Sequence, residues 1–342
     1  MAGQLRVVHS VARSYDALQV NVSGRPLAML TRISRQLVVL ACGATVLIVA
    51  AGARGDDLAE RFKTLTKSSQ WVEVDQVKVG FVTHHPQGMV KIGDQFFVSS
   101  VEIVAPTQRF EQPQGGYDRT PGKGVGHLFK MGADGALIES VTLGEGDIYH
   151  PGGIDYDGRW LWVPVAEYRP NSASIVYRVD PETLGAEEVF RFRDHIGGIV
   201  HDTDTNTLHG VSWGSRRFYA WRLDEQLAPA EPDVEPEQIR ALNPSHYIDY
   251  QDCHYAGASQ MLCSGLNKYE VTGAGTVALG GLELVDLTDN RPVHQVPVPL
   301  WVSPDLAMTN NPVACEAAPA DFRCYFMPQD DESALFIYEV RD

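Results

Sequence analysis

After about residue 75, the chain almost lacks the apolar spacing of three to four residues that marks amphipathic helices. Alternating and β-branched runs, separated by Gly, Asp and Asn, take its place and indicate an all-β protein. With 342 residues, 44% of them hydrophobic, the chain is long enough to bury a large core. Repeat folds of this length form one domain, so we expect a single domain over residues 54–342.

Basic residues are also scarce, with 28 Lys and Arg against 44 Asp and Glu and a formal net charge of -16. Five arginines but only one acid, Asp16, lie in the first 53 residues, so the remainder is more acidic still. This charge argues against non-specific nucleic-acid binding and against docking on an anionic membrane. We therefore expect no nucleic-acid partner. The charge says little about the substrate, which we expect to be a carbohydrate or another small molecule bound by a monomer.

One long apolar run, residues 36–52 (QLVVLACGATVLIVAAG), follows Arg32 and Arg35 and ends in small residues. A basic segment, an apolar run and small residues in that order are typical of a secretory signal. Met29 offers an alternative start that would bring the run closer to the N-terminus. Residues 1–53 are therefore predicted to be an extension with a signal peptide, and the domain to be periplasmic or secreted. The alternative is an uncleaved membrane anchor, which would be the only membrane contact, since the run is near the short limit for a span.

The sequence has few cysteines, and four of the five fall outside the apolar run. They form two local pairs that each bracket a hairpin turn: Cys253 with Cys263, and Cys315 with Cys324. In an oxidising compartment such pairs predict two disulfides. Neither pair has the two-residue spacing of a zinc knuckle, which weakens a metal-binding interpretation of the cysteines.

A short pattern recurs five times and supplies the main evidence for the fold. The copies are His85-Pro86-Gln87-Gly88, His150-Pro151-Gly152-Gly153, His195-Ile196-Gly197-Gly198, Gln251-Asp252-Cys253-His254 and Asn311-Pro312-Val313-Ala314. Each copy begins a set of four predicted strands, as in a propeller blade. The third copy has a poorly defined fourth strand near residues 246–248. The fifth has only three strands, and residues 71–79 can supply the fourth and close the ring. In this alignment both cysteine pairs lie opposite each other. We therefore predict a five-bladed β-propeller closed by an N-terminal strand, with six or seven blades as the alternative.

In such a propeller the first residue of each copy lies at the axis on one face. These residues are His85, His150, His195, Gln251 and Asn311. The three histidines are predicted metal ligands, with Gln251 as the fourth, because neutral imidazoles leave the ion a strong Lewis acid. Mn, Zn or Fe suits imidazole, whereas Ca prefers more oxygen. Small residues after each histidine favour this hypothesis, because they would leave the axis open. The alternative is that the histidines only pack adjacent blades.

The ends of the second strands fall beside this ring and carry polar side chains. Glu102 and Glu167 are candidate general acids or bases, and Tyr250 is a candidate proton donor. The predicted substrate-binding residues are Arg169, Arg217, Lys268 and Asn311. Residues 105–124, rich in Gly, Pro and Gln, predict a binding loop or lid over this face, with a disordered insertion as the alternative.

The region after the signal resembles secreted single-domain β-propellers, the group that includes strictosidine-synthase-like, gluconolactonase-like and virginiamycin-lyase-like proteins. The set His85, His150, His195 and Gln251 is similar to that of oligogalacturonate lyases, which hold Mn through three His and one Gln. That resemblance implies a metal that neutralises a uronate carboxylate during β-elimination. Simple glycoside hydrolysis would require paired carboxylates at the axis, where this chain has imidazoles and amides.

The leading hypothesis is an exported metal-dependent lyase or hydrolase that acts on a carbohydrate or a carboxylated small molecule. A second is a non-catalytic propeller that binds a glycan or a protein. A third, a lactonase-like hydrolase with Ca, predicts carboxylates around the ion. Metal analysis of the purified protein separates these hypotheses.

Overall fold

The computed structural model describes residues 55–273, 275–303, 305–317 and 322–341, all within one compact unit, Val49–Asp342. The predicted signal peptide or anchor, residues 1–53, lies outside the described residues. Within the described ranges, no helix is both long and apolar enough to cross a membrane.

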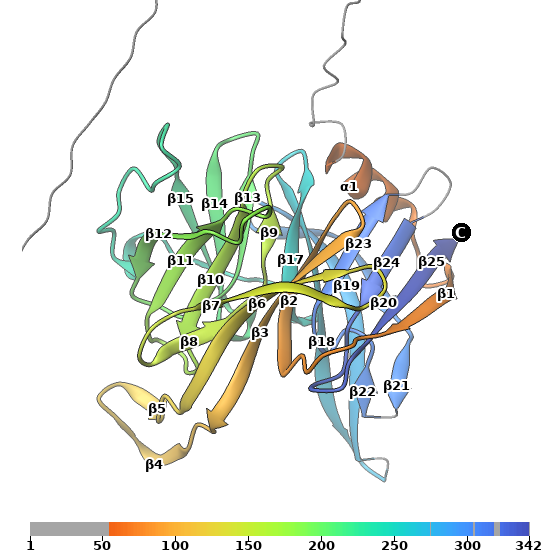
Figure 1. Ribbon diagram of the computed structural model, residues 1–342, viewed down its shortest axis with the longest axis horizontal. Coiled ribbons are helices and arrows are strands. Elements are labelled where there is room, and N and C mark those ends of the chain that lie inside the picture. The colour runs from red at the N-terminus through yellow and green to blue at the C-terminus, as the bar shows by residue number, and fades with distance from the viewer. Residues whose placement is uncertain (1–54, 274, 304, 318–321, 342) are drawn as a thin grey trace, which may run out of the picture. The chain divides into compact units, whose positions relative to one another are not determined.

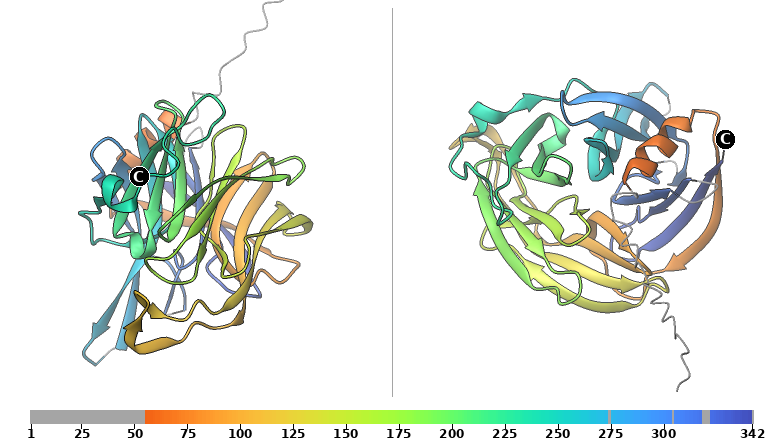
Figure 2. Two further views of the ribbon diagram at one scale, coloured as in Figure 1. Left: turned by 90° about the vertical axis from the view of Figure 1, so that its left-hand side faces the viewer. Right: turned by 90° about the horizontal axis from the view of Figure 1, so that it is seen from above.

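Five antiparallel sheets surround a common axis, so the described chain is a five-bladed β-propeller, as predicted (Figure 1; Figure 2, right). Blade one contains β2 (His85–Ile92), β3 (Gln95–Ala105), β6 (Lys123–Gly132) and β7 (Leu137–Leu143). Blade two contains β8 (Ile148–Pro151), β9 (Asp155–Tyr156), β10 (Leu161–Glu167), β11 (Ser174–Val179) and β12 (Ala186–Phe192). Blade three contains β13 (Ile196–Asp202), β14 (Thr207–Ser212), β15 (Arg217–Arg222) and β16 (Ala241–Leu242). Blade four contains β17 (Asp249–Gly257), β18 (Gln260–Val271), β19 (Gly275–Asp286) and β20 (Arg291–Val298). Blade five contains β23 (Val313–Ala317), β24 (Phe322–Phe326), β25 (Ala334–Arg341) and β1 (Gln70–Lys78).

Several short elements lie outside the five blades. They are the hairpin of β4 (Arg109–Gln114) and β5 (Tyr117–Arg119), the hairpin of β21 (Trp301–Ser303) and β22 (Leu306–Ala307), the helices α1 (Gly55–Thr64) and α2 (Pro236–Ile239), and a 3-10 turn (Trp213–Ser215). In Figure 1, α1 lies at the upper face and the β4–β5 hairpin at the lower face. Leu58 and Phe62 of α1 pack with Leu284 and Phe322, so the helix covers the upper ends of blades four and five.

The ring is closed by the strand that the sequence predicted. β1 pairs antiparallel with β25, from Gln70 opposite Arg341 to Lys78 opposite Ala334. An N-terminal strand therefore completes the blade formed by the end of the described chain. This pairing covers an edge that would otherwise expose unpaired backbone groups.

The prediction for the fourth strand of blade three was wrong. β16 is Ala241–Leu242, opposite Phe218 and Arg217, and not residues 246–248. The Asn243 amide nitrogen donates to the Ser215 carbonyl oxygen at 2.8 Å, and Pro244 follows. Because proline cannot donate to a strand ladder, pairing ends there and the chain turns towards β17.

Apolar clusters between neighbouring blades form the core. Leu128 and Val163 pack between blades one and two, and Trp162 packs with Tyr219 between blades two and three. Each such side chain contributes roughly 1.5–3 kcal/mol when fully buried. Consecutive apolar residues such as Leu161, Trp162 and Val163 of β10 therefore supply both faces of a blade.

The glycines after the motif histidines do not open the axis, contrary to our expectation. The Gly153 N–H donates to the Gly197 carbonyl at 2.8 Å, which joins the inner strands of blades two and three. A Cβ on Gly152 would lie 2.2 Å from the Gly197 oxygen, and one on Gly88 would lie 2.5 Å from the Ile154 nitrogen. The glycines are therefore needed because backbone meets backbone at the axis.

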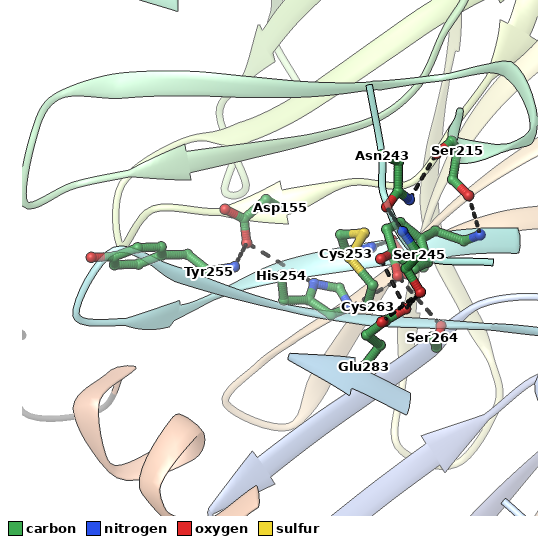
Figure 3. Close-up of a disulfide and its surroundings, with 12 residues drawn as sticks. Asp155, Ser215, Asn243, Ser245, Cys253, His254, Tyr255, Cys263, Ser264 and Glu283 are labelled. Carbon is green, nitrogen blue, oxygen red and sulfur yellow. Dashed lines mark hydrogen bonds and ion pairs between the residues drawn. A yellow bond between two sulfur atoms is a disulfide. The ribbon is translucent and has the colours of Figure 1, made fainter. Parts of the chain in front are cut away.

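Both predicted disulfides are present. Cys253–Cys263 joins β17 to β18 (Figure 3), and Cys315–Cys324 joins β23 to β24, each across directly opposed strand positions. Disulfides of this kind are typical of an oxidising, extracytoplasmic location.

Candidate functional site

Three motif histidines lie in a row at one end of the axis. The ring centroid of His150 is 6.5 Å from that of His85 and 6.1 Å from that of His195. His150 is only 5% exposed, and neither of its ring nitrogens has a hydrogen-bond partner among the described residues. Burial, with smaller effects from His195 and His85, holds the pKa of His150 well below its usual value, so the ring is neutral. An unpartnered buried polar group costs about 1–3 kcal/mol, which marks His150 as a place where a ligand would be stabilised.

The two flanking imidazoles are oriented by neighbouring oxygen atoms. His195 Nδ1 lies 2.8 Å from the Glu167 carbonyl oxygen, which can only accept, so Nδ1 donates and Nε2 keeps the lone pair. Burial lowers the pKa of His195 to about 4, and the ring is therefore neutral. His85 Nδ1 lies 2.8 Å from Asp330 Oδ1. Donation from Nδ1 to an acceptor is the arrangement that orients metal-binding histidines.

Asp330 is itself held by the fifth motif copy. The Asn311 amide nitrogen donates to Asp330 Oδ1 at 2.9 Å, and Asn311 is fully buried. Burial raises the pKa of Asp330, but the hydrogen bond and charge of His85, with the amide of Asn311, outweigh burial and lower the pKa overall. Asn311, Asp330 and His85 thus form one connected chain of side chains.

Gln251, the predicted fourth ligand, comes from blade four and is half-buried. Its amide nitrogen donates to the Asn310 carbonyl at 3.0 Å, so the amide oxygen is the atom suited to a ligand role. The assignment of Gln251 and the three histidines as metal ligands remains a prediction.

An aromatic wall borders the histidine row. Tyr168 stacks on His150, with ring centroids 4.2 Å apart, and Trp213 meets His195 edge-on at 4.8 Å. The Arg119 guanidinium lies 4.9 Å from the Trp213 ring centroid. The sequence analysis missed Trp213. The signal that could have found it is positional, since Tyr168 and Trp213 each directly follow the second strand of their blade.

The predicted binding loop, residues 105–124, contains the ordered β4–β5 hairpin and is not a disordered insertion (Figure 1). The Tyr149 hydroxyl donates to the Pro121 carbonyl at 2.6 Å, and the Arg169 guanidinium lies 3.5 Å from the Tyr117 ring centroid. With Arg119 over Trp213, these contacts dock the segment against the aromatic wall.

The other predicted site residues have different surroundings. Glu167 pairs with Arg169, whose Nε donates to Oε2 at 2.6 Å. Arg217 donates to Asn171 Oδ1 and to Asp194 Oδ1 at 2.9–3.2 Å, and Lys268 is exposed on β18.

Tyr250 is turned into the interior of blade four. Its hydroxyl donates to Glu283 Oε2 at 2.9 Å, and Ser245, beside Glu283 in Figure 3, bonds to the same carboxylate. Burial, with the charge of Glu283, raises the pKa of Tyr250 far above its usual value. A phenol held in this way is a poor proton donor to the histidine row.

Glu102 lies in a second group of potential ligands on blade one. Its Oε2 is 3.4 Å from His127 Nε2 and 4.0 Å from His84 Nε2. The ligand atoms of these three residues all lie within 4.8 Å of one another, so the group could hold a metal ion. His127 was missed from the sequence, because only the pairing of β3 with β6 brings it beside Glu102.

A buried carboxylate joins the inner strands deeper along the axis. Asp252 Oδ2 accepts from the Met89 N–H at 2.7 Å, and Oδ1 accepts from the Ile154 N–H at 3.1 Å. Burial disfavours the charged form of His254, but the Asp252 carboxylate outweighs it and raises the pKa of His254 to about 9. Asp252 therefore links blades one, two and four, which is a structural role.

The fold and the histidine row define a five-bladed β-propeller with an imidazole-lined axial site. Residues 44–341 match the model of a family of unknown function, DUF6454, and the chain belongs to that family. No curated protein matches the chain.

Several solved structures are similar to this chain at low sequence identity. A hypothetical protein from Leishmania major is 10% identical with a TM-score of 0.48, over 78% of this chain and 90% of that chain. A luciferin-regenerating enzyme is 11% identical with a TM-score of 0.41, over 80% and 96%. A mannose phosphorylase from Leishmania mexicana is 10% identical with a TM-score of 0.43, over 82% and 91%. At these values the likeness carries no argument about the chemistry of this chain.

Proposed function

We propose that this protein is an exported, metal-dependent propeller enzyme, a lyase or hydrolase, that binds a carbohydrate or carboxylated small molecule at the axial histidines. The observation that carries the proposal is His150, which is buried without a hydrogen-bond partner between two other imidazoles. The disulfides support export, because they persist in oxidising compartments.

The donor set fits a divalent transition ion. His85 and His195 have Nδ1 engaged, which leaves Nε2 as the ligand atom, and neutral His150 has a lone pair to offer. The centroid spacings of 6.1 and 6.5 Å require the rings to draw together around an ion. When bound, such an ion would polarise a substrate carboxylate or carbonyl. Asp330 would orient His85.

The wall residues would bind the rest of the substrate. Aromatic faces such as Tyr168 and Trp213 pack against apolar faces of a ligand and exclude water. Arg119 would attract a substrate carboxylate, although Asp118 accepts from its Nε at 2.9 Å and partly neutralises it. These features favour a substrate with both a ring and an anionic group.

Metal analysis of the purified protein tests the proposal. Protein prepared with Mn, Zn or Fe should contain one ion at the axis by mass spectrometry, and His150→Ala should lose it. His209→Gln is the matched control, since His209 is also buried but lies on β14 of blade three. The proposal fails if no transition metal binds and His150→Ala leaves stability unchanged. A screen of uronate substrates for unsaturated products then separates elimination from hydrolysis.

The aromatic wall favours a second candidate, a non-catalytic propeller that recognises a glycan. The stack of His150, Tyr168 and Trp213 offers a ligand platform that needs no metal. In that case metal-free protein would bind a glycan without converting it, and Trp213→Ala would abolish binding.

A further inference from the structure

We propose that His84, Glu102 and His127 form a second divalent-metal site, separate from the axial histidines, that takes a zinc-like ion and braces the closure of the ring. The proposal does not depend on the proposed enzymatic function. His85 follows His84 in the chain but belongs to the axial row, and its Nδ1 forms a hydrogen bond with Asp330.

The spacing of the ligand atoms suits a small tetrahedral ion. Metal–ligand distances of about 2.0–2.2 Å place adjacent ligand atoms roughly 3.3 Å apart. His127 Nε2 lies 3.4 Å from Glu102 Oε2, and His84 Nε2 lies 4.0 Å from the same oxygen. The two imidazoles stack at an interplanar angle of 15°, so one ring must rotate for both lone pairs to converge.

The burial of His127 provides the second observation. Its Nε2 is shielded from solvent, and Glu102 Oε2 lies 3.4 Å away, so the nitrogen faces the carboxylate. An imidazole beside a carboxylate is a ligand pair that zinc binds. Two imidazoles and one carboxylate leave one position open for water or another ligand.

The site has a path for an ion to enter. The side chains of Glu102 and His84 are 43% and 25% exposed, while that of His127 is 15% exposed. The group is therefore open on the Glu102 side and closed on the His127 side. The acidic chain, with a formal net charge of -16, also attracts cations.

The position of His84 gives the ion a structural consequence. His84 lies between β1 and β2 with φ of 55°, a left-handed conformation that non-glycine residues adopt infrequently. Its carbonyl accepts from the Asp331 N–H of blade five at 2.6 Å. Glu102 is on β3 and His127 on β6, both in blade one. An ion at this group would therefore tie the connection from the closing strand β1 to the sheet of blade one.

Zinc and cobalt titrations of the full chain test this site. The variants His127→Ala and Glu102→Gln are each made together with His150→Ala and His195→Ala, so that the axial imidazoles do not compete for the ion. They remove one imidazole and one carboxylate charge from the second site. His246→Ala is the control, because His246 is exposed between β16 and β17 and accepts a hydrogen bond from Arg216 at 2.8 Å, away from His84, Glu102 and His127. The double variant His150→Ala/His195→Ala isolates the second site from the axial row.

We expect the double variant and the control to bind one Zn²⁺ at His84, Glu102 and His127, and zinc should raise their melting temperature. Co²⁺ at the same site should give a tetrahedral spectrum. Glu102→Gln should bind at least tenfold more weakly, and His127→Ala should lose the Co²⁺ spectrum. Circular dichroism verifies that both variants are folded. The proposal is overturned if folded His127→Ala and Glu102→Gln bind zinc as tightly as the double variant. It is also overturned if the double variant binds none. Loss of the axial ion alone would contradict only the proposed function.

Discussion

At the scale of single residues, the same imidazole side chain serves different roles according to its surroundings. The ring of His150 is buried and has no hydrogen-bond partner among the described residues. His254, in contrast, lies against Asp252, which raises its pKa to about 9. His209, buried in blade three, has its pKa lowered to about 4. The repeated motif identified the axial histidines, but burial and neighbouring charges determine what each ring can do.

His209 leads to a prediction about acid stability. Burial lowers its folded pKa to about 4, while the unfolded value is about 6.5. Between these values the unfolded chain binds the additional proton, so stability falls as pH falls from about 6.5 to 4, by up to about 3 kcal/mol from this group. His209→Gln should therefore show a smaller loss of unfolding free energy over this range.

Urea denaturation at several pH values measures this difference. His246→Gln, an exposed substitution, should follow the wild-type pH dependence. Parallel curves for wild type and His209→Gln would show that His209 does not titrate differently in the folded state.

At the scale of elements, the closing strand β1 stabilises the ring mainly through its backbone. Most β1 side chains are exposed, and the strand pairs with β25 along its length. An uncovered β25 would present free backbone donors and acceptors that promote association between chains. The hairpin β4–β5, by contrast, lies on the surface, where Tyr117 packs against Arg169.

Two truncated chains isolate the contribution of β1. A chain that begins at Ser69 lacks α1 but keeps β1, and a chain that begins at Val79 lacks both. We expect the Val79 chain to have the lower melting temperature and to associate, as measured by light scattering after size exclusion. Equal melting temperatures and equal masses would refute a role for β1 in closure. Addition of a peptide of residues 69–78 should partly reverse the effect.

At the scale of the whole molecule, five sheets with interlocking inner strands share one axis. Each disulfide joins the first two strands of a single blade, so neither links distant parts of the ring. Their stabilising effect therefore comes from restricting short loops in the unfolded chain.

The double substitution Cys315→Ser/Cys324→Ser should lower the free energy of unfolding by about 2–3 kcal/mol, as expected for a loop of roughly ten residues. Equilibrium denaturation of both proteins, with and without reductant, measures the loss. Reductant should destabilise the wild type more than the variant, which retains one disulfide. An unchanged midpoint in the variant would contradict the prediction.

Much of the architecture was predictable because it depends on local patterns. Alternation and turn residues identified the blades, and the opposition of Cys253 with Cys263 supported the alignment. The fourth strand of blade three was misplaced, because its two residues carry little pattern of their own. Trp213 and His127 were not predicted, because their contacts with His195 and Glu102 depend on residues from other strands.

The sequence by itself determined the all-β class, the five-bladed repeat, the closing strand and the cysteine pairing, because each depends on short-range periodicity and turn chemistry. Only the tertiary structure decided that glycines bring the inner strands into contact and that His84, Glu102 and His127 meet on blade one. Burial and long-range pairing produce these features. Burial lowers the pKa of His209 to about 4, and the Asp252 carboxylate raises that of His254 to about 9, a difference that the repeated motif does not encode.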